Sequence, residues 1–186
     1  INFRKISLEL LGGDFNANGS YSTTRKNRAL MNLDMYLSNI SFLKSYNYFN
    51  SVKRYASVVK YFDGNFSTTL NMNLVLDENY YPIYEKVNAQ GDLSSSNVTV
   101  LQNTAFSKLD ILDNKIFENN NIIKDLKVSF QIKNGLFKID KTPLKFKDFT
   151  AFIYGSTSNT QDIDYTIEAE IPFSMVKKSI FGTKKL

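Results

Sequence analysis

The segment VKRYASVVKYFDGNFSTTLNMNLVLD, residues 52–77, contains the junction between two kinds of secondary structure. Up to the junction, apolar side chains recur at the spacing of one helix face, and they are Phe42, Tyr46, Phe49, Val52, Ala56 and Val59. After Asp63-Gly64, apolar and polar side chains alternate as in a half-buried strand, and the apolar set is Phe66, Leu70, Met72, Leu74 and Leu76. The segment therefore predicts a helix that begins after an N-cap at Ser41, stops at Gly64 and leads into a long strand.

The alternating pattern continues on both sides of this junction. Strand patterns cover residues 1–40, 63–102 and 122–173, and helical spacing covers residues 41–62 and 103–118. Turn signals separate the strands at Gly12-Gly13, Asn134-Gly135 and Pro143, and Asn-Gly is typical of a type I′ hairpin. Strands joined by short turns predict an antiparallel meander. We therefore expect a single domain of the mainly β (β-rich α+β) class: a long curved antiparallel sheet that forms a groove, with two amphipathic helices packed at it or capping it.

The C-terminal half contains the second predicted helix, at residues 103–118, and a basic tail. The helix shows its apolar stripe at Ala105, Leu109, Leu112 and Ile116. Residues 174–186 form the tail, which carries the lysines Lys177, Lys178, Lys184 and Lys185. We interpret this tail as a solvated segment, and contact with anionic lipid headgroups as the less favoured alternative.

Composition excludes several classes of function. The chain has 186 residues, enough for one domain with a real core. It has no Cys and no His, which removes disulfides, thiol nucleophiles, the commonest general base and the commonest ligand of transition metals. The net charge of +5 comes from scattered basic residues and does not indicate nucleic-acid binding. We therefore expect no enzyme, no metal site and no nucleic-acid partner.

One face of the predicted sheet is apolar along its long strands. Beside the strand at residues 65–76, the apolar set comprises Val128, Phe130, Ile132, Ile163, Tyr165 and Ile167. Either the chain's own helices or a bound ligand could cover this face. The chain's own helices would make it an ordinary core, whereas a ligand would make it an apolar groove with an adaptable lining. In the second case, the helix at residues 41–62 is the candidate cap.

The order of motifs resembles the C-terminal region of AsmA-like proteins of the bacterial cell envelope. The string YFDGNFSTTLNMN, Tyr61–Asn73, follows a helical segment in the manner of that family. A second helical pattern, the Asn134-Gly135 turn, a Gly155-Ser156 turn and the strand start Ile163-Asp164-Tyr165 then follow in the family's order. The resemblance covers roughly residues 30–173. It departs from the family at Asn73, Ser95 and Asn97, where small residues are usual.

The resemblance implies a fold and a function. AsmA-like proteins are similar to repeating β-groove transporters, in which a long twisted antiparallel sheet shields phospholipid acyl chains between the inner and outer membranes. It implies a bound phospholipid, contact with the membrane surface or with other envelope proteins, and a periplasmic location. Because the chain begins at Ile1 and carries no membrane-spanning helix, we interpret it as a C-terminal piece of a longer protein anchored to the inner membrane.

The main alternative is a β-rich structural or adaptor module of the cell envelope, with an ordinary closed core, that docks onto other envelope proteins. An enzyme is the least favoured class. The acidic pairs Asp162/Asp164 and Glu168/Glu170 each lie on one face of a strand, which is the pattern of a solvated surface. Tyr80, Tyr81 and Tyr84 near Glu85 are interpreted as loop and interface aromatics.

Overall fold

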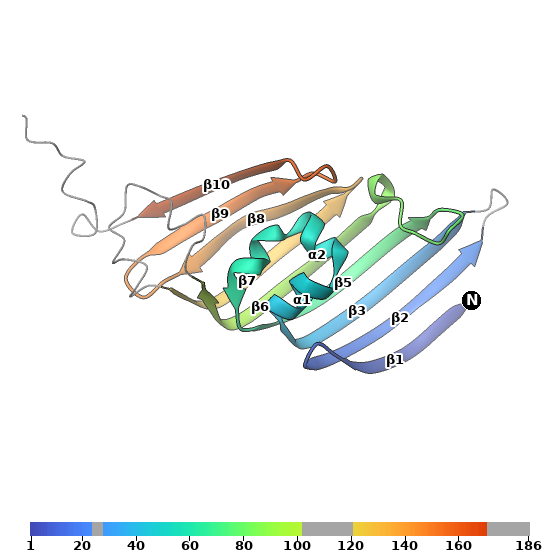
Figure 1. The fold of residues 1–186 in the computed structure, drawn as a ribbon, viewed down its shortest axis with the longest axis horizontal. Coiled ribbons are helices and arrows are strands. Elements are labelled where there is room, and N and C mark those ends of the chain that lie inside the picture. The colour runs from blue at the N-terminus through green and yellow to red at the C-terminus, as the bar shows by residue number, and fades with distance from the viewer. Residues whose placement is uncertain (24–27, 102–120, 171–186) are drawn as a thin grey trace, which may run out of the picture.

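The computed structural model describes residues 1–23, 28–101 and 121–170. Within these residues, ten strands form one open antiparallel sheet in the order β1-β2-β3-β5-β6-β7-β8-β9-β10, and β4 pairs with β6 beside this path (Figure 1). The prediction of a mainly β protein built on a curved antiparallel sheet is confirmed. The strands are β1 Asn2–Leu10, β2 Gly13–Thr23, β3 Ala29–Ser41, β4 Phe62–Asp63, β5 Asn65–Leu76, β6 Asn88–Val100, β7 Ile122–Lys133, β8 Leu136–Lys145, β9 Thr150–Thr157 and β10 Ile163–Glu170.

The strand register separates the two faces of the sheet. One cross-strand row joins Leu33, Met72, Ala89, Ile132 and Phe137. The adjacent row joins Asn18, Asp34, Asn71, Gln90 and Gln131. Because neighbouring residues of a strand point to opposite faces, the first row belongs to an apolar face and the second to a polar face. The period-two pattern of the sequence therefore decides both faces.

The helical segment lies on one face of the sheet, in front of its middle strands in Figure 1. It comprises α1 Phe42–Tyr48, α2 Asn50–Tyr55 and the 3₁₀ turn η1 Ser57–Tyr61; a second 3₁₀ turn, η2 Tyr84–Lys86, precedes β6. Ser41 is the N-cap of α1, as the sequence predicts, and its side chain accepts a hydrogen bond from the Lys44 amide. The prediction of one continuous helix over residues 41–62 is wrong, because the backbone leaves the helical region at Phe49 and at Ala56.

The core lies between this helical segment and the central strands. Ile40, Val98 and Ile123 are completely buried, and the Phe42 side chain packs among them. The Phe42 ring centroid is 4.7 Å from that of Phe66 and 5.9 Å from that of Phe62. The start of α1 is therefore fixed to the sheet by aromatic packing.

The structure confirms some of the turns that the sequence predicts and contradicts others. Asn134 and Gly135 both have positive φ, at 50° and 77°, and they connect β7 to β8 as the Asn-Gly signal predicts. The predicted turn at Pro143 is wrong, because this residue lies inside β8 opposite Phe152. Gly155-Ser156 is also not a turn, because Gly155 lies inside β9 opposite Tyr165. At the first hairpin, the turn residues are Leu11 and Gly12, and β2 begins at Gly13.

Two predicted segments lie outside the described residues. They are the second helix, residues 103–118 with its stripe of Ala105, Leu109, Leu112 and Ile116, and the basic tail, residues 174–186.

Candidate functional site

The structure brings the predicted groove-lining residues onto one face of the sheet. Register rows connect Met72 to Ile132 and Leu70 to Phe130 across β6, and the second row continues through β8 and β9 to Tyr165. Phe66 and Leu76 are buried on this face, whereas Leu70, Met72, Leu74, Val128, Phe130, Ile132 and Tyr165 are half-buried and Ile163 and Ile167 are exposed. The lining itself stays a prediction, because the burial of these residues is compatible with a core or with a ligand-binding face.

The helical segment covers the middle of this face. Of its predicted stripe, Phe42 is buried, and Tyr46, Phe49, Val52, Ala56 and Val59 are half-buried. Tyr55, which the stripe omits, is only 5% exposed. Its ring centroid lies 6.3 Å from that of Tyr84 and 6.4 Å from that of Phe137. The breaks at Phe49 and Ala56 change which side chains face the sheet. The apolar periodicity of the sequence does not predict these breaks.

Both ends of the apolar face carry exposed side chains. On β1, Ile6 and Leu8 are 39% and 46% exposed; on β10, Ile163 and Ile167 are 64% and 40% exposed. Met31 and Met35 on β3 and Met72 on β5 are half-buried on the same face. Methionine side chains adapt their shape to irregular apolar partners. The apolar face therefore extends beyond the part that the described helices cover.

A polar cluster ties the distal end of the helical segment to the sheet. Arg54 Nη1 donates a hydrogen bond to the backbone carbonyl of Asn159 at 2.5 Å, and its guanidinium lies 4.2 Å from the centroid of the Tyr84 ring. Asn159 Nδ2 in turn donates to Glu85 Oε1 at 2.8 Å. Beside them, Tyr55 Oη is buried and has no hydrogen-bond partner in the described part of the chain. Desolvation by burial raises the pKa of Tyr55, and the nearby Arg54 charge opposes this shift.

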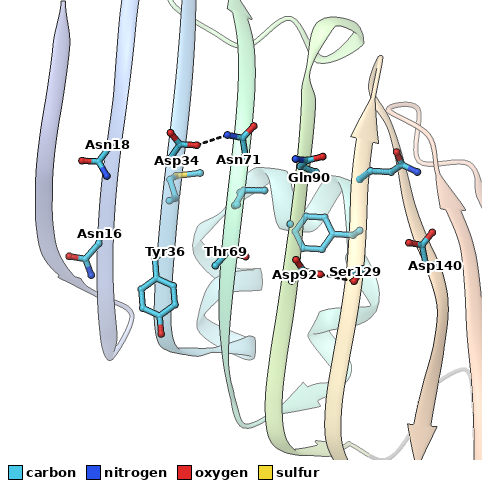
Figure 2. Close-up of a pocket in the computed structure, with 15 residues that line it drawn as sticks. Asn16, Asn18, Asp34, Tyr36, Thr69, Asn71, Gln90, Asp92, Ser129 and Asp140 are labelled. Carbon is cyan, nitrogen blue, oxygen red and sulfur yellow. Dashed lines mark hydrogen bonds between the residues drawn. The ribbon is translucent and has the colours of Figure 1, made fainter.

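The polar face is hollowed over strands β2 to β8. Figure 2 shows this hollow from the side opposite the helices, with polar side chains projecting from the strands. Its volume is about 750 Å³, and its lining includes Asp34, Tyr36, Asn71, Gln90, Asp92 and Ser129. Asn71 donates a hydrogen bond to Asp34, and Ser129 Oγ donates to Asp92 Oδ1 at 2.6 Å. The sequence does not predict this hollow, because alternation assigns the polar positions of each strand only to a solvated surface.

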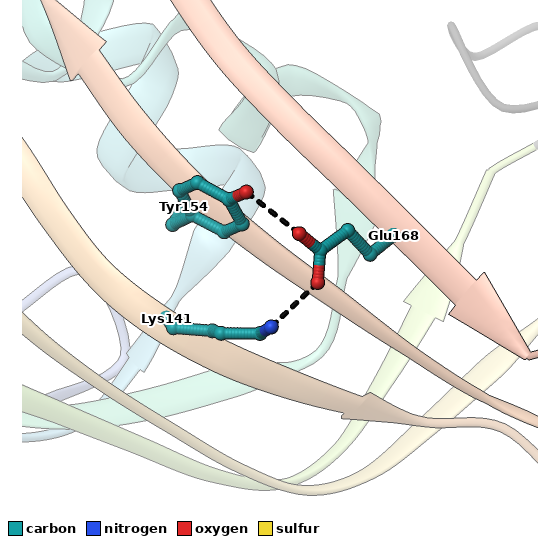
Figure 3. A network of polar contacts seen from close by, with 3 residues as sticks. All are labelled: Lys141, Tyr154 and Glu168. Carbon is teal, nitrogen blue, oxygen red and sulfur yellow. Dashed lines mark hydrogen bonds and ion pairs between the residues drawn. The ribbon is translucent and has the colours of Figure 1, made fainter.

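A second polar cluster lies near the β10 edge of the sheet. Glu168 accepts hydrogen bonds from Lys141 Nζ at 2.5 Å and from Tyr154 Oη at 2.7 Å (Figure 3). The Lys141 hydrogen bond, followed by that of Tyr154, lowers the pKa of Glu168, and the same contacts raise the pKa values of Lys141 and Tyr154. All three groups face solvent, so the cluster is a surface contact between β8, β9 and β10.

The described residues contain no group of three or more acidic side chains placed to hold a metal ion. No helix in the described ranges has the length and apolar character to cross a membrane. Comparisons with protein-family models, with curated proteins and with solved structures find no match for this chain. The resemblance to AsmA-like proteins therefore stays a prediction.

Proposed function

We propose that the apolar face of the sheet binds the acyl chains of phospholipids and shields them from water. The observation that carries this proposal is the exposure of large apolar side chains at both ends of the face, with Leu8 on β1 and Ile163 on β10. Exposed apolar surface of this kind costs free energy in water and usually has a binding purpose in a soluble protein. The half-buried methionines between these ends suit chains of irregular shape.

The wider role rests on the sequence resemblance. A protein of this kind carries phospholipid between the inner and outer membranes of a bacterial envelope and supports the outer membrane. The movement needs no bond-making step, because an acyl chain gains similar contacts at each position along the parts of the apolar face that the helical segment leaves exposed. This role places the chain in the periplasm, with membrane surfaces and other envelope proteins as partners.

One observation favours the adaptor alternative. Ile40, Val98 and Ile123 are completely buried under the helical segment, so the middle of the apolar face is an ordinary core in the described residues. In an adaptor, the exposed ends of the face would contact a protein partner instead of lipid. The two functions differ in whether lipid accompanies the purified protein.

Native mass spectrometry with lipid extraction, on protein purified without detergent, tests the proposal. The informative variant is Met72→Asp, which places a charge on the apolar face of β5. The matched control is Asn73→Asp, the next residue of the same strand on the polar face. Leu8→Asp on β1 provides a second, more exposed position, and circular dichroism establishes that each variant is folded.

We expect stoichiometric phospholipid with the wild type and with Asn73→Asp, and its loss with Met72→Asp and Leu8→Asp. A single charge in a bilayer-like apolar environment is costly enough for this loss. Wild-type protein that carries no lipid, and takes up none from phospholipid vesicles, would contradict acyl-chain binding and favour the adaptor.

A further inference from the structure

The polar hollow on the opposite face has features of a ligand site of its own. It spans strands β2 to β8 and lies on the side of the sheet away from the helical segment (Figure 2). The hollow has a volume of about 750 Å³ and is open to solvent along the strands. The strand register brings polar side chains from distant parts of the sequence together on this surface.

A single cross-strand row runs through the hollow. It consists of Asn18, Asp34, Asn71, Gln90 and Gln131, each paired by register with the next. Neighbouring strands lie about 4.8 Å apart, which is comparable with the length of one sugar unit in a linear polysaccharide. A polysaccharide chain lying across the strands would therefore meet one amide or carboxylate side chain at about every unit.

The hydrogen-bonding groups in the hollow are of mixed type. A carboxamide donates through its nitrogen and accepts through its oxygen, as sugar hydroxyls also do. Gln90, Gln131 and Tyr36 have no side-chain hydrogen bond to another described residue, whereas Asn71 and Ser129 hold Asp34 and Asp92 in fixed positions. Gln90 and Gln131, at the β6–β7 end of the row, are thus available to a ligand, and the carboxylates of Asp34 and Asp92 are pre-oriented to accept hydrogen bonds.

The charged side chains that line the hollow restrict the class of ligand that it could bind. The described residues that line the hollow include the carboxylates of Asp34, Asp92 and Asp140 but no lysine or arginine. These carboxylates favour a neutral ligand over nucleic acid, phosphate groups or acidic polysaccharides at the centre of the hollow, and Lys138, opposite Gln131, and Lys127, two residues before Ser129, lie beside it on the same face. The carboxylates also do not converge on one metal position, because no group of three acidic side chains is placed to hold an ion in the described residues.

An aromatic ring completes the site. Tyr36 is 46% exposed although it sits in the middle of a strand, and its side chain projects from β3 beside the row (Figure 2). An exposed ring on a polar sheet face offers an apolar surface and a hydroxyl at the same place. The apolar C–H face of a sugar ring fits such a surface while its hydroxyls meet the amides.

We propose that this hollow binds a neutral linear polysaccharide, with its chain lying across β3 to β7. Gln90 and Gln131 exchange hydrogen bonds with the hydroxyls, Asp34 and Asp92 accept from them, and Tyr36 packs against one sugar ring. The site is independent of the proposed acyl-chain face, because the two use opposite faces of the same sheet.

Two-dimensional amide NMR and isothermal titration calorimetry on the chain test this site. The probes are cellohexaose and chitohexaose as neutral sugars, hexagalacturonate as an anionic sugar, and tetralysine as a cationic peptide. We expect the neutral hexasaccharides to shift amides of β3, β5, β6 and β7. The disaccharides of the same two neutral sugars should bind more weakly than the hexasaccharides, because they span fewer strands.

The variants Gln90→Ala and Tyr36→Ala should each weaken binding of the hexamer about fivefold, which corresponds to the loss of one hydrogen bond or ring contact. Tyr81→Ala, an exposed tyrosine in the connection before β6 and outside the hollow, is the matched control for Tyr36 and should bind as the wild type does. The apolar-face variant Met72→Asp should also bind sugar normally, so failure of one site is distinguishable from failure of the other.

Three outcomes would overturn the proposal. The first is that neither neutral hexasaccharide binds. The second is that tetralysine binds more tightly than both sugars, which would identify the hollow as an acidic docking surface for a cationic protein. The third is that sugar binding is unchanged in both Gln90→Ala and Tyr36→Ala.

Discussion

Arg54 in α2 donates a hydrogen bond to the backbone carbonyl of Asn159, 2.5 Å away in the connection between β9 and β10. These residues are 105 positions apart in the chain. The contact fixes the far end of the helical segment, whose near end is fixed by the Phe42 ring in the core. The same guanidinium packs over Tyr84, so one side chain connects α2, η2 and the β9–β10 connection.

We expect Arg54→Gln to loosen the distal end of the helical segment and to lower the free energy of unfolding by about 1–2 kcal/mol. The loss combines one charge-assisted hydrogen bond and one cation–π contact. Hydrogen exchange should become faster at the amides of α2 and η1 and stay unchanged in β6 and β7. Lys53→Gln, which changes an exposed charge on the same helix, is the control, and an equal effect of the two substitutions would refute the role of Arg54.

Tyr55→Phe should keep the stability of the protein or raise it slightly, by up to about 1 kcal/mol. The buried hydroxyl has no partner in the described residues, so its removal abolishes an uncompensated desolvation cost and leaves the ring contacts with Tyr84 and Phe137 in place. Tyr55→Ala should instead destabilise, because it removes the ring. Chemical denaturation of the two variants checks this order, and a clear loss of stability in Tyr55→Phe would reveal a hidden hydrogen-bond partner.

In the helical segment, the sequence predicts the start of the helix but not the breaks within it. Spacing and the Ser41 cap correctly place the start of the helix, because both are local signals. At Phe49 the backbone is extended, with φ −99° and ψ 114°, and this break separates two helices that are too short to be stable alone. Asn47, Asn50 and Ser51 lower the cost of the break, since their side chains compete for backbone hydrogen bonds. A periodic stripe contains no information about such a break.

The adjacent residues Ile122 and Ile123 provide a direct test of the core. Ile123 is completely buried and Ile122 is 43% exposed. We expect Ile123→Ala to cost about 2–5 kcal/mol in unfolding free energy, and Ile122→Ala to cost less than about 1 kcal/mol. Urea unfolding curves of the two variants measure both values. Equal costs would contradict this assignment of the two side chains, and a register of β7 shifted by one residue, which exchanges the two faces, would reverse the order of the two costs.

The β7–β8 hairpin depends on Gly135, which has a φ of 77° and packs close to the backbone of η2. A Cβ at this position would lie 2.7 Å from the Tyr84 carbonyl oxygen. Gly12 also has a positive φ, but a Cβ there would meet only the end of Lys44 at 3.6 Å. Gly135→Ala should therefore cost about 1–3 kcal/mol, and more than Gly12→Ala, which adds backbone strain without a clash. Thermal unfolding of both variants tests this order.

The polar hollow was beyond prediction for a different reason. Alternation correctly assigns Asn71, Gln90 and Gln131 to the face opposite Met72, because period two is a local property of a strand. Which of these residues become neighbours depends on strand order and register, which involve residues far apart in the chain. The register also shifts between Leu37 and Ile40 and between Ile139 and Thr142, and such irregularities bend a strand and increase its twist. These features are set by the whole sheet.

The Glu168 cluster leads to a pH-dependent prediction. The pKa of the Glu168 carboxyl group is lowered in the folded protein, mainly by the hydrogen bond from Lys141 and to a smaller extent by that from Tyr154. A carboxyl group with a lowered folded pKa stabilises the fold above its unfolded pKa, and this contribution is lost as the pH falls through the folded pKa. We therefore expect Glu168→Gln to flatten the dependence of stability on pH in the acidic range, with an effect that is small because the group faces solvent.

Carboxyl-carbon NMR titration separates the two donors. Lys141→Met should raise the pKa of Glu168 more than Tyr154→Phe does, because the lysine hydrogen bond makes the larger contribution. Asp162 serves as the internal control, since hydrogen bonds from Thr160 and Ser158 lower its pKa independently of Lys141. If Lys141→Met left the Glu168 pKa unchanged, the cross-strand contact between β8 and β10 would not persist in solution, and the exposed β10 edge would be held by its pairing with β9 alone.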